Sequence, residues 1–401
     1  MSLSKSKYVV TCSHGFEPFL QKELARLNIQ KLKAGHGSVE FTGTLIDAYR
    51  TMLWSRLGSR VLMEIGRFEG TTQEELYEGV LDIPWEEHMD VDGRLWIDFT
   101  GQSKEIRHTQ FAARKAKDAI VDRFREQYNK RPSVDKDADL RIHIHLHHGL
   151  FTVSIDLCGT PLHVRTPDKH ITDAPLKETL AAAMLYASGW DKAHKKGVAL
   201  VDPMCGSGTI VLEAMGIACR RAPGLIRQEW NVFRWLQFDQ KVWNQVVQET
   251  KESQLEAPKA PIFGFDIDAS AIDCVRHNAK AQGVPVPNLR VQPLESLKTP
   301  LAEQQGFLVT NPPYGERIGS HAHVSGVYET LGNQLSHFPI ESWRCFLLCP
   351  PNELYQQTGF HRTEERITLY NGPLKCRFLE LDLHRPTHPV IDETPSHEQR
   401  T

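Results

Sequence analysis

Residues 198–209 read Val-Ala-Leu-Val-Asp-Pro-Met-Cys-Gly-Ser-Gly-Thr, and an apolar Ile-Val-Leu run follows at 210–212. This order predicts a buried strand, a glycine turn and the start of a helix, as in the nucleotide-type loop of a doubly wound sheet. Gly206 and Gly208 permit positive φ angles and a close approach of the backbone to a ligand. The loop lacks the Lys-Ser/Thr ending of a triphosphate-binding loop and the spacing of a dinucleotide loop. Its opening acid, Asp202, suits a cationic ligand better than a pyrophosphate.

The next predicted strand, residues 262–265, ends in an acidic residue. Asp266 stands where doubly wound sheets bind the hydroxyl groups of a ribose. The alternative is that Asp266 caps the helix expected over 271–281, but Asp268 suits that position better. We therefore expect Asp266 to face a ligand.

A second motif, Asn311-Pro312-Pro313-Tyr314, follows an apolar predicted strand over 307–310. The two prolines end regular structure because neither can donate a backbone hydrogen bond. Asn311 Oδ1 and the Pro312 carbonyl can accept the two N–H bonds of an exocyclic amine, while Tyr314 stacks on its ring. Stacking needs the ring and not the hydroxyl, so Tyr314→Phe is expected to retain most activity. A proline-rich turn without a ligand is the alternative, and the glycine loop upstream favours the binding interpretation.

The chain has 401 residues, a length that is enough for two or three domains. Its formal net charge is -3. A charge this close to zero excludes a protein that coats nucleic acid over its whole surface, so any RNA-binding surface must be local. No apolar run approaches a membrane span and no leader pattern opens the sequence, which predicts a soluble, cytoplasmic protein. The eight cysteines form no Cys-x-x-Cys pair. We expect Cys345 and Cys349 to be buried, reduced thiols rather than zinc ligands.

The N-terminal part predicts two small α+β units. In the first, strands at 8–10, 38–41 and 61–65 alternate with helices at 16–27 and 45–53. The second has strands at 95–99, 140–146 and 151–157 and a helix at 107–128. In that helix we expect four side chains to face inward: Phe111, Ala116, Ile120 and Phe124.

Basic residues gather on that helix, with nine basic residues against four acidic ones between Lys104 and Arg131. Such a local excess is typical of a surface that follows a phosphate backbone, and a solvated helix face is the alternative. The candidate RNA contacts are Arg56, Arg60, Lys104, Arg107, Arg114, Lys115 and Lys117.

The strand at 140–146 carries a second pattern, because His143, His145 and His147 alternate with apolar residues. Alternation places all three histidines on one face of the strand, opposite the core. A metal site is one interpretation. No cysteine or carboxylate partner is evident nearby, so we expect a face open to solvent or RNA and no metal.

Together these features resemble one family. The matching stretches are Trp-Ser-Arg-Leu-Gly-Ser-Arg at 54–60, Pro-Leu-Lys-Glu-Thr-Leu-Ala-Ala-Ala at 175–183, the glycine loop, and Asn-Pro-Pro-Tyr-Gly-Glu-Arg at 311–317. They are similar to bacterial 23S ribosomal RNA guanine-N2 methyltransferases that carry an N-terminal THUMP module. The likeness extends from about residue 5 to about residue 385.

The resemblance implies an α/β fold in which N-terminal α+β units precede a Rossmann-like class I methyltransferase sheet. The implied parts are a ferredoxin-like domain at 1–65, a THUMP RNA-binding domain at 66–165, a linker with the first catalytic helix at 166–190, the methyltransferase domain at 191–385, and a disordered tail at 386–401.

It also implies S-adenosylmethionine as the methyl donor and the Asn-Pro-Pro-Tyr residues as the catalytic group. The implied cofactor contacts are Asp202, Pro203, Met204, Cys205, Gly206, Ser207, Gly208, Thr209, Asp266, Ile267, Pro293, Leu294, Lys177 and Thr179. Relatives place an acid after the third strand to bind the adenine amine. Here Pro293 stands in that place, which leaves the role to Glu295 or to a backbone group.

The implied reaction is methyl transfer to N2 of a guanine in 23S ribosomal RNA, either in the large subunit or in an assembly intermediate. A transfer-RNA guanine-N2 methyltransferase would share both the module and the motif. An adenine-N6 DNA methylase or a protein glutamine methyltransferase would share the motif but would not need an RNA-binding module. A non-enzymatic RNA chaperone would not need an intact motif.

Overall fold

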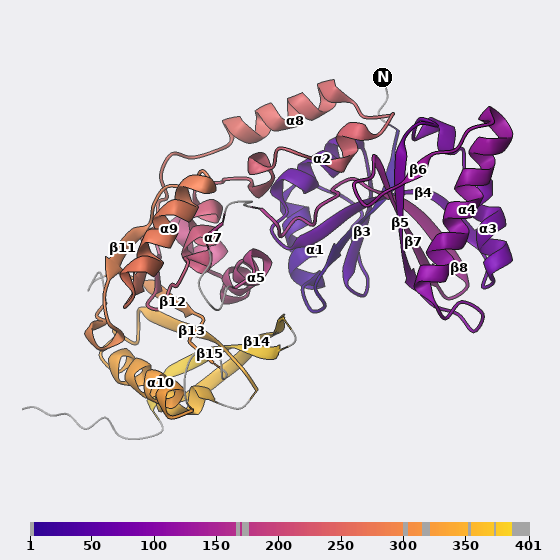
Figure 1. Cartoon of the computed structure of the whole chain (residues 1–401). Coiled ribbons are helices and arrows are strands. Elements are labelled where there is room, and N and C mark those ends of the chain that lie inside the picture. The colour runs from indigo at the N-terminus through magenta and orange to yellow at the C-terminus, as the bar shows by residue number, and fades with distance from the viewer. Residues whose placement is uncertain are drawn as a thin grey trace, which may run out of the picture. The chain divides into compact units, whose positions relative to one another are not determined.

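The computed structural model describes residues 4–165, 169–170, 176–299, 304–314, 321–351, 354–372 and 374–386. They form two compact units (Figure 1). The first unit comprises residues 1–167 and 222–254, and the second comprises residues 168–221 and 255–401. The chain therefore leaves the second unit after Arg221 and rejoins it at Leu255. Within the described ranges no helix is long and apolar enough to cross a membrane.

The first unit is built on one eight-stranded sheet in the order β2-β3-β1-β4-β8-β7-β5-β6. β4 pairs antiparallel with β1 on one side and with β8 on the other, so the two expected N-terminal parts share one sheet. The boundary expected at residue 65 lies inside β4. The strands are β1 (Ser6–Cys12), β2 (Lys33–Ala34), β3 (Ser38–Gly43), β4 (Gly58–Glu69), β5 (Arg94–Gly101), β6 (Ser133–Val134), β7 (Leu140–His147) and β8 (Leu150–Asp156).

Among the described residues, four α-helices precede the linker: α1 (Glu17–Arg26), α2 (Leu45–Trp54), α3 (Gln73–Leu81) and α4 (Thr109–Tyr128). The prediction for α4 was right for Ala116, Ile120 and Phe124, which are buried, and wrong for Phe111, which is 56% exposed. The buried face of the first turn starts at Ala112 instead. Phe111 is five residues before Ala116, and at 100° per residue that separation turns it away from the core.

The histidine row on β7 is confirmed. Leu140, Ile142, Ile144 and Leu146 are buried, and the alternating residues lie on the opposite, more open face. Thr100 of β5 bridges two of the rings, since its Oγ1 lies 3.2 Å from His143 Nε2 and 2.8 Å from His145 Nδ1. Partial burial lowers the pKa of His143 to about 4, so this imidazole is neutral at physiological pH.

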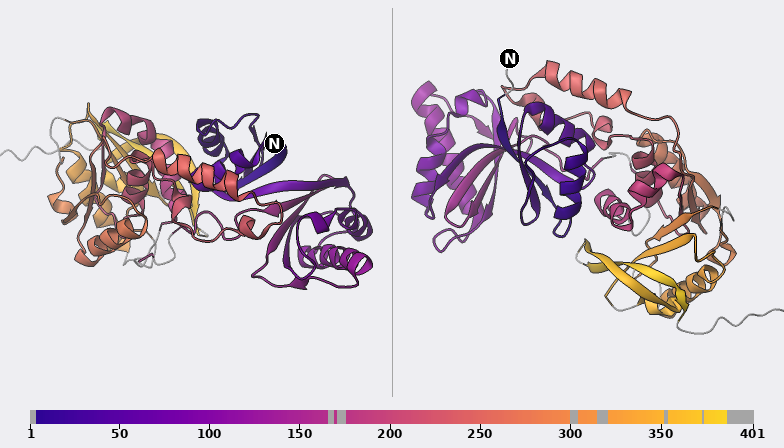
Figure 2. Two further views of the ribbon diagram at one scale, coloured as in Figure 1. Left: turned by 90° about the horizontal axis from the view of Figure 1, so that it is seen from above. Right: turned by 180° about the vertical axis from the view of Figure 1, so that it is seen from behind.

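Residues 222–254 pack with the first unit although they interrupt the second in sequence. Their one α-helix among the described residues, α8 (Gln240–Glu252), lies beside α2 (Figures 1 and 2). Trp54 Nε1 donates to Thr250 Oγ1 at 3.2 Å, and Trp235 Nε1 donates to His88 Nδ1 at 3.1 Å. Five large apolar side chains of the segment are buried: Trp230, Val232, Trp235, Trp243 and Val246. A fragment starting at residue 191 would expose them, so experiments on this protein require the full chain.

The second unit confirms the expected doubly wound α/β sheet, with strand order β11-β10-β9-β12-β13-β15-β14. The first five strands in this order are parallel, and β15 runs antiparallel to β13. The strands are β9 (Ala199–Asp202), β10 (Ile262–Asp266), β11 (Asn288–Val291), β12 (Gly306–Thr310), β13 (Trp343–Cys349), β14 (Phe360–Asn371) and β15 (Leu374–Pro386). Because chain order reverses between β9 and β12, a ligand crevice is expected outside their carboxyl ends.

The helices of this unit are α5 (Glu178–Ser188), α6 (Trp190–Ala193), α7 (Thr209–Ala218), α9 (Ala269–Ala281) and α10 (His321–Leu335). Cys345 and Cys349 of β13 are buried free thiols, as expected, and burial raises the pKa of both. The tail expected from residue 386 onward lies almost wholly outside the described residues, as do 315–317 of the family-like stretch.

Candidate active site

The glycine loop joins β9 to α7 and has the backbone that its sequence predicts. Gly206 and Gly208 have φ angles of 51° and 84°. A Cβ atom at Gly208 would lie 2.7 Å from Val275 of α9, so a larger residue would displace the loop. Cys205 N donates to Phe265 O at 2.8 Å, which holds the loop against β10. Glycine at position 208 therefore lets the loop pack closely against α9.

Asp266 is hydrogen-bonded to the backbone of this loop. Its Oδ2 accepts from Gly206 N at 2.8 Å, and its Oδ1 accepts from Asp268 N at 3.0 Å. Asp268 caps α9 through Ser270 N, as the sequence predicts, so Asp266 is free of that role. A carboxylate offers about four acceptor positions. Asp266 therefore retains capacity for a hydroxyl group of a ligand.

Asp202 lies under the loop and is only 2% exposed. Its Oδ1 accepts from Thr310 Oγ1 at 2.8 Å and from Met204 N at 3.3 Å. Burial raises the pKa of Asp202 to about 7, because the charged form loses its hydration. The bond to Thr310 links the glycine loop directly to the residue before Asn311.

The Asn-Pro-Pro-Tyr motif follows β12 at the same edge of the sheet. Asn311 Oδ1 is buried and has no hydrogen-bond partner among the described residues. Leaving such an acceptor unpaired costs about 1–3 kcal/mol, which marks the atom as a candidate ligand contact. Tyr314, Met204 and Leu294 come from three predicted loops, and each packs against the hydrophobic core of the second unit.

The remaining predicted cofactor contacts follow β10 and β11 or lie at the start of α5 and in the glycine loop. Pro293 precedes a short 3₁₀ turn, and its neighbour Gln292 donates from N to Asp266 O at 2.8 Å. Ile267 is 72% exposed beside Asp266. Lys177 is an exposed residue at the N-cap of α5, and Thr179 is buried in the first turn of that helix. In the glycine loop, Pro203, Cys205, Ser207 and Thr209 are buried and Met204 is half-buried.

The sequence did not predict which residues outside the glycine loop support it through hydrogen bonds. Asn278 of α9 is fully buried; its Nδ2 donates to Ser207 O at 3.1 Å and to His170 O at 2.8 Å. Lys169 Nζ lies 2.7 Å from Glu178 Oε1. The sequence could have indicated the role of Asn278, because it is a polar residue on the helix face that buries Ala271, Ile272 and Val275. A buried polar side chain in such a place is expected to form hydrogen bonds.

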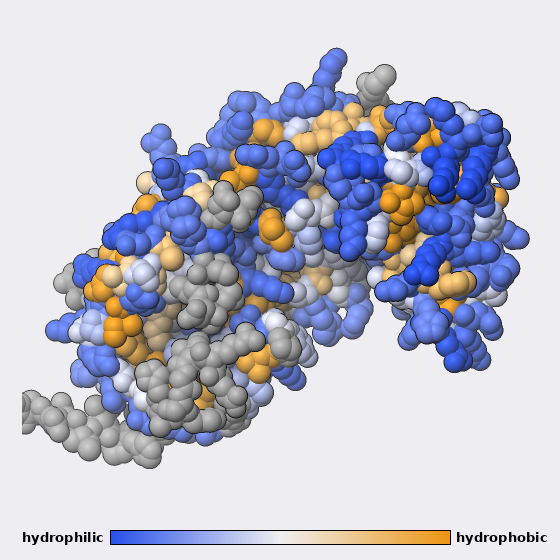
Figure 3. Space-filling view, in the orientation of Figure 1, coloured by the Kyte–Doolittle hydropathy of each residue, from blue (hydrophilic) through white to orange (hydrophobic). Residues whose placement is uncertain are grey.

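Most of the predicted RNA contacts on and before α4 are open to solvent. Lys104, Arg107 and Arg114 are exposed, and Phe111 is exposed among them. Lys115 Nζ lies 4.8 Å from the centre of the Tyr77 ring, and Lys117 pairs with its neighbour Asp118. The face seen in Figure 3 is mainly hydrophilic, with hydrophobic residues in small separate groups.

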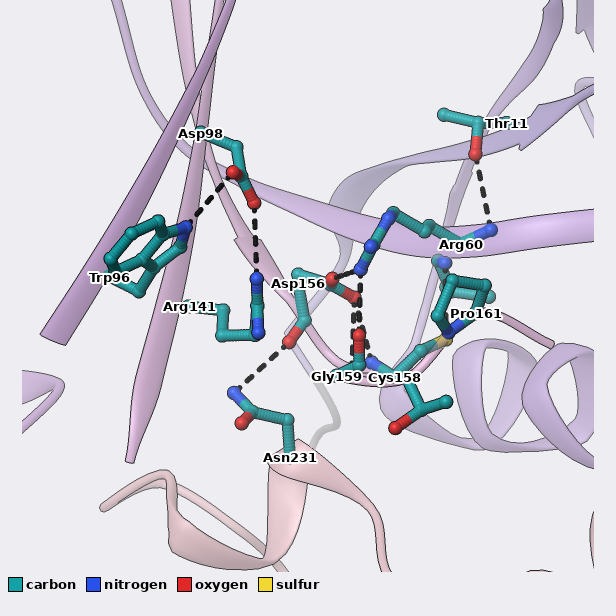
Figure 4. A network of polar contacts seen from close by, with 12 residues as sticks. Thr11, Arg60, Trp96, Asp98, Arg141, Asp156, Cys158, Gly159, Pro161 and Asn231 are labelled. Atoms are coloured by element: carbon teal, nitrogen blue, oxygen red, sulfur yellow. Dashed lines mark hydrogen bonds and ion pairs between the residues drawn. The ribbon is translucent and has the colours of Figure 1, made fainter. Parts of the chain in front are cut away.

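Arg56 and Arg60 lie in a different setting, inside the first unit. Arg60 bonds to Asp156 and donates to Gly159 O at 2.8 Å, and Asn231 of the 222–254 segment donates to Asp156 O (Figure 4). Arg56 is only 6% exposed, and its backbone N donates to the buried Glu23. Both arginines therefore make contacts within the first unit, and little of the Arg56 surface is accessible to an RNA.

Candidate metal ligands do not converge in the parts of the chain that the structure describes. No group of three or more His, Cys, Asp or Glu side chains there is placed to hold an ion. The sheet edge brings together a loop backbone, two carboxylates, an aromatic ring and an amide oxygen that has no hydrogen-bond partner among the described residues.

Three family models match the chain, each over a different part. Residues 7–62 match a ferredoxin-like domain, and residues 70–156 match the THUMP domain. Residues 165–380 match the RMKL-like methyltransferase domain. The matches follow the order that the sequence predicted.

Two curated relatives, both named ribosomal RNA large subunit methyltransferase K/L, come from Syntrophotalea carbinolica and Psychromonas ingrahamii. They are 40% and 37% identical over 94% and 98% of this chain. These alignments cover 53% and 52% of the relatives, so the chain spans about half the length of the curated relatives it matches.

Two solved structures match over nearly their whole length. One is a predicted N6-adenine-specific DNA methylase from Listeria monocytogenes, with a TM-score of 0.80, 28% identity, and 94% and 96% of the two chains covered. The other, assigned as a methyltransferase and crystallised with SAH, has a TM-score of 0.79 at 27% identity and covers 94% and 97%. Since the RMKL-like methyltransferase model spans more than half of the residues, the chain belongs to that methyltransferase family.

Proposed function

We propose that this protein transfers a methyl group from S-adenosylmethionine to the exocyclic N2 amine of a guanine in 23S ribosomal RNA, in the cytoplasm. The observation that carries the proposal is the buried, unpartnered Oδ1 of Asn311, among the described residues, at the sheet edge that also holds the glycine loop. Such an acceptor suits an amine that must be held in one orientation while it reacts.

The residues present fit the methyl donor. Its positively charged sulfonium supplies a methyl group to a nucleophile. The open backbone at Gly206 and Gly208 accommodates a ligand, and Asp266 has acceptor capacity for ribose hydroxyls. Ile267 and Leu294 offer apolar surface for the adenine ring. Because proline stands at position 293, we assign recognition of the adenine amine to backbone groups near Gln292 or to Glu295.

The chain's own residues act on the amine. Asn311 Oδ1 accepts one N–H bond and the Pro312 carbonyl accepts the other, which draws the nitrogen lone pair out of conjugation and directs it outward. Tyr314 stacks on the base after it has left its own stack. Orientation of this kind can contribute about 7–11 kcal/mol to the rate. The described site offers no side-chain base beside Asn311, so the proton leaves to water after transfer.

RNA is favoured over DNA as the substrate by the THUMP match and by the exposed cations near Phe111. The names of the curated relatives point to large-subunit ribosomal RNA. The name of the Listeria structure points to adenine N6, which is also an exocyclic amine and would fit the same acceptors. A transfer RNA remains the alternative RNA substrate.

Methylated nucleosides distinguish these substrates. The full chain, incubated with S-adenosylmethionine and protein-free 23S ribosomal RNA, transfer RNA or duplex DNA, is expected to form N2-methylguanosine in 23S ribosomal RNA. Mass spectrometry of the digested nucleic acid detects the product. If the product is N6-methyladenine in DNA, the substrate is DNA and not 23S ribosomal RNA. If N2-methylguanosine forms only in transfer RNA, the substrate is transfer RNA.

Asn311→Ala is expected to lower the single-turnover rate at saturating cofactor by roughly 10²–10³-fold, the cost of losing one preorganised polar partner. Cofactor affinity and the melting temperature should stay near wild-type values, because Oδ1 has no hydrogen-bond partner among the described residues. Asn244→Ala, a change at an exposed asparagine of α8, serves as the control. If folded Asn311→Ala reacts at the wild-type rate, the motif is only a structural turn and does not bind the amine.

Cofactor affinity is expected to rise as pH rises through 7. The folded pKa of Asp202 is raised to about 7, so the carboxyl is largely protonated at pH 6 and must ionise to attract a cationic ligand. Between pH 6 and 7.5 the ionised fraction grows by about eightfold, and affinity should follow it. This range lies below the titration of the ligand's own α-amino group, near about 7.7–8.0. Calorimetry on wild type and Asp202→Asn tests this, since the variant should lose the slope; equal slopes would place the titrating group elsewhere.

The exposed cations are expected to contribute to RNA binding through phosphate contacts. Arg107→Ala and Arg114→Ala should each weaken binding across RNA sequences and lower the slope of log K against log salt by about one. Filter binding at several salt concentrations measures both. Lys22→Ala, which changes an exposed lysine on α1, is the control. Unchanged slopes would make the basic part of α4 an ordinary solvated face.

A further inference from the structure

We propose that Asn371 is a positioning residue for methyl transfer: it holds the ring of Tyr314 at the angle from which the ring stacks on the target base. The proposal rests on the proposed function of the Asn-Pro-Pro-Tyr motif. It assigns a role to a side chain that is 57 residues away in sequence and belongs to a different element.

The contact is a direct hydrogen bond. Asn371 is the last residue of β14, at the turn into β15, where it pairs with Leu374. Its Nδ2 donates to Tyr314 Oη at 2.8 Å. Burial raises the pKa of Tyr314 well above its usual value, so the phenol remains neutral and able to accept this bond at any physiological pH.

The surroundings of the ring explain why its polar contacts affect its angle. Tyr314 is partly buried and packs against the apolar core of the second unit, and apolar packing is non-directional. Cys376 of β15 also lies beside the hydroxyl group. Rotation about the Cβ–Cγ bond is broad for a tyrosine. The hydroxyl oxygen lies on the axis of this rotation, so the bond from Asn371 fixes the direction of the axis. Because the hydroxyl group prefers hydrogen-bond partners near the ring plane, the bond also favours one rotation of the ring, and stacking on a base depends on the direction of the ring plane.

The two polar side chains of the motif are treated differently by the fold. Asn311 Oδ1 has no hydrogen-bond partner among the described residues and is available to the amine, whereas Tyr314 Oη already has one. The hydroxyl therefore has an orienting role, and Tyr314→Phe should cost activity. This revises the expectation from the sequence that the ring alone suffices.

A double-mutant cycle tests the proposal in the full chain. Under single-turnover conditions with saturating S-adenosylmethionine, Asn371→Ala and Tyr314→Phe are each expected to slow methylation by roughly three- to tenfold. The double variant should be no slower than the slower single variant, because both changes remove the same bond. Effects that multiply would overturn the proposal, since Asn371 would then act independently of the Tyr314 hydroxyl.

Two further variants separate positioning from a general effect on the hairpin. Asn371→Asp should recover most of the rate, because its carboxylate accepts a hydrogen bond from the phenol O–H at the same place. Thr368→Val removes a hydroxyl bond to Glu365 on the same strand and should leave the rate unchanged. Cofactor affinity by calorimetry should be unchanged in all of them. A loss in Asn371→Asp as large as in Asn371→Ala would contradict the orienting role.

A spectroscopic measurement keeps this test separate from that of the proposed function. With 3-fluorotyrosine incorporated, the ¹⁹F resonance absent from Tyr314→Phe identifies the ring of Tyr314. In Asn371→Ala this resonance should shift and sharpen as the ring gains freedom, and Thr368→Val should leave it in place. A resonance unaffected by Asn371→Ala would refute the positioning role, whether or not the protein methylates the proposed RNA. Wild-type inactivity on every nucleic acid would refute the proposed function alone.

Discussion

The hydrogen bond from Thr310 to Asp202 joins the two strands on which the candidate site depends. β9 and β12 are parallel neighbours although more than a hundred residues separate them in the sequence. At their carboxyl ends, Thr310 Oγ1 donates to Asp202 Oδ1 at 2.8 Å. The glycine loop starts at one end of this bond and Asn311 follows the other. The bond therefore sets the spacing between the part that would hold a methyl donor and the part that would hold an amine.

This arrangement has an energetic cost. Asp202 is buried deeply enough to raise its pKa to about 7, and Asn311 Oδ1 lacks a partner among the described residues. The charged form of Asp202 would be more stable in water, and Asn311 Oδ1 would be more stable with a hydrogen-bond partner. The surrounding sheet compensates by packing, with Leu308, Leu347 and Leu379 of neighbouring strands fully buried. Groups held in this way lose little further freedom when a ligand arrives, which is the physical basis of preorganisation.

The first unit depends on a different constraint, a single sheet shared by both N-terminal parts. β4 supplies the shared strand, and the 222–254 segment packs α8 against α2 while Asn231 bonds to Asp156 at the end of β8. The segment belongs by sequence to the methyltransferase match and by packing to the first unit. The chain thus crosses between the two units more than once. Separating the proposed RNA-binding and catalytic activities into fragments would break buried contacts.

Local patterns in the sequence determined much of this protein. Strand, glycine turn and helix at 198–212, the acid after the next strand, and the cap at Asp268 depend on neighbouring residues, so short-range propensity and spacing predicted them. The alternating histidines of β7 were predicted for the same reason. The outward direction of the Phe111 side chain was not predicted, because the face that a helix buries is set by the elements against which it packs. Only the tertiary structure showed that Arg60 is held by Asp156, that Asn278 supports the glycine loop, and that Asn371 reaches Tyr314. These pairs are separated by 96, 71 and 57 residues, and such contacts arise when the sheets assemble, which no local pattern encodes.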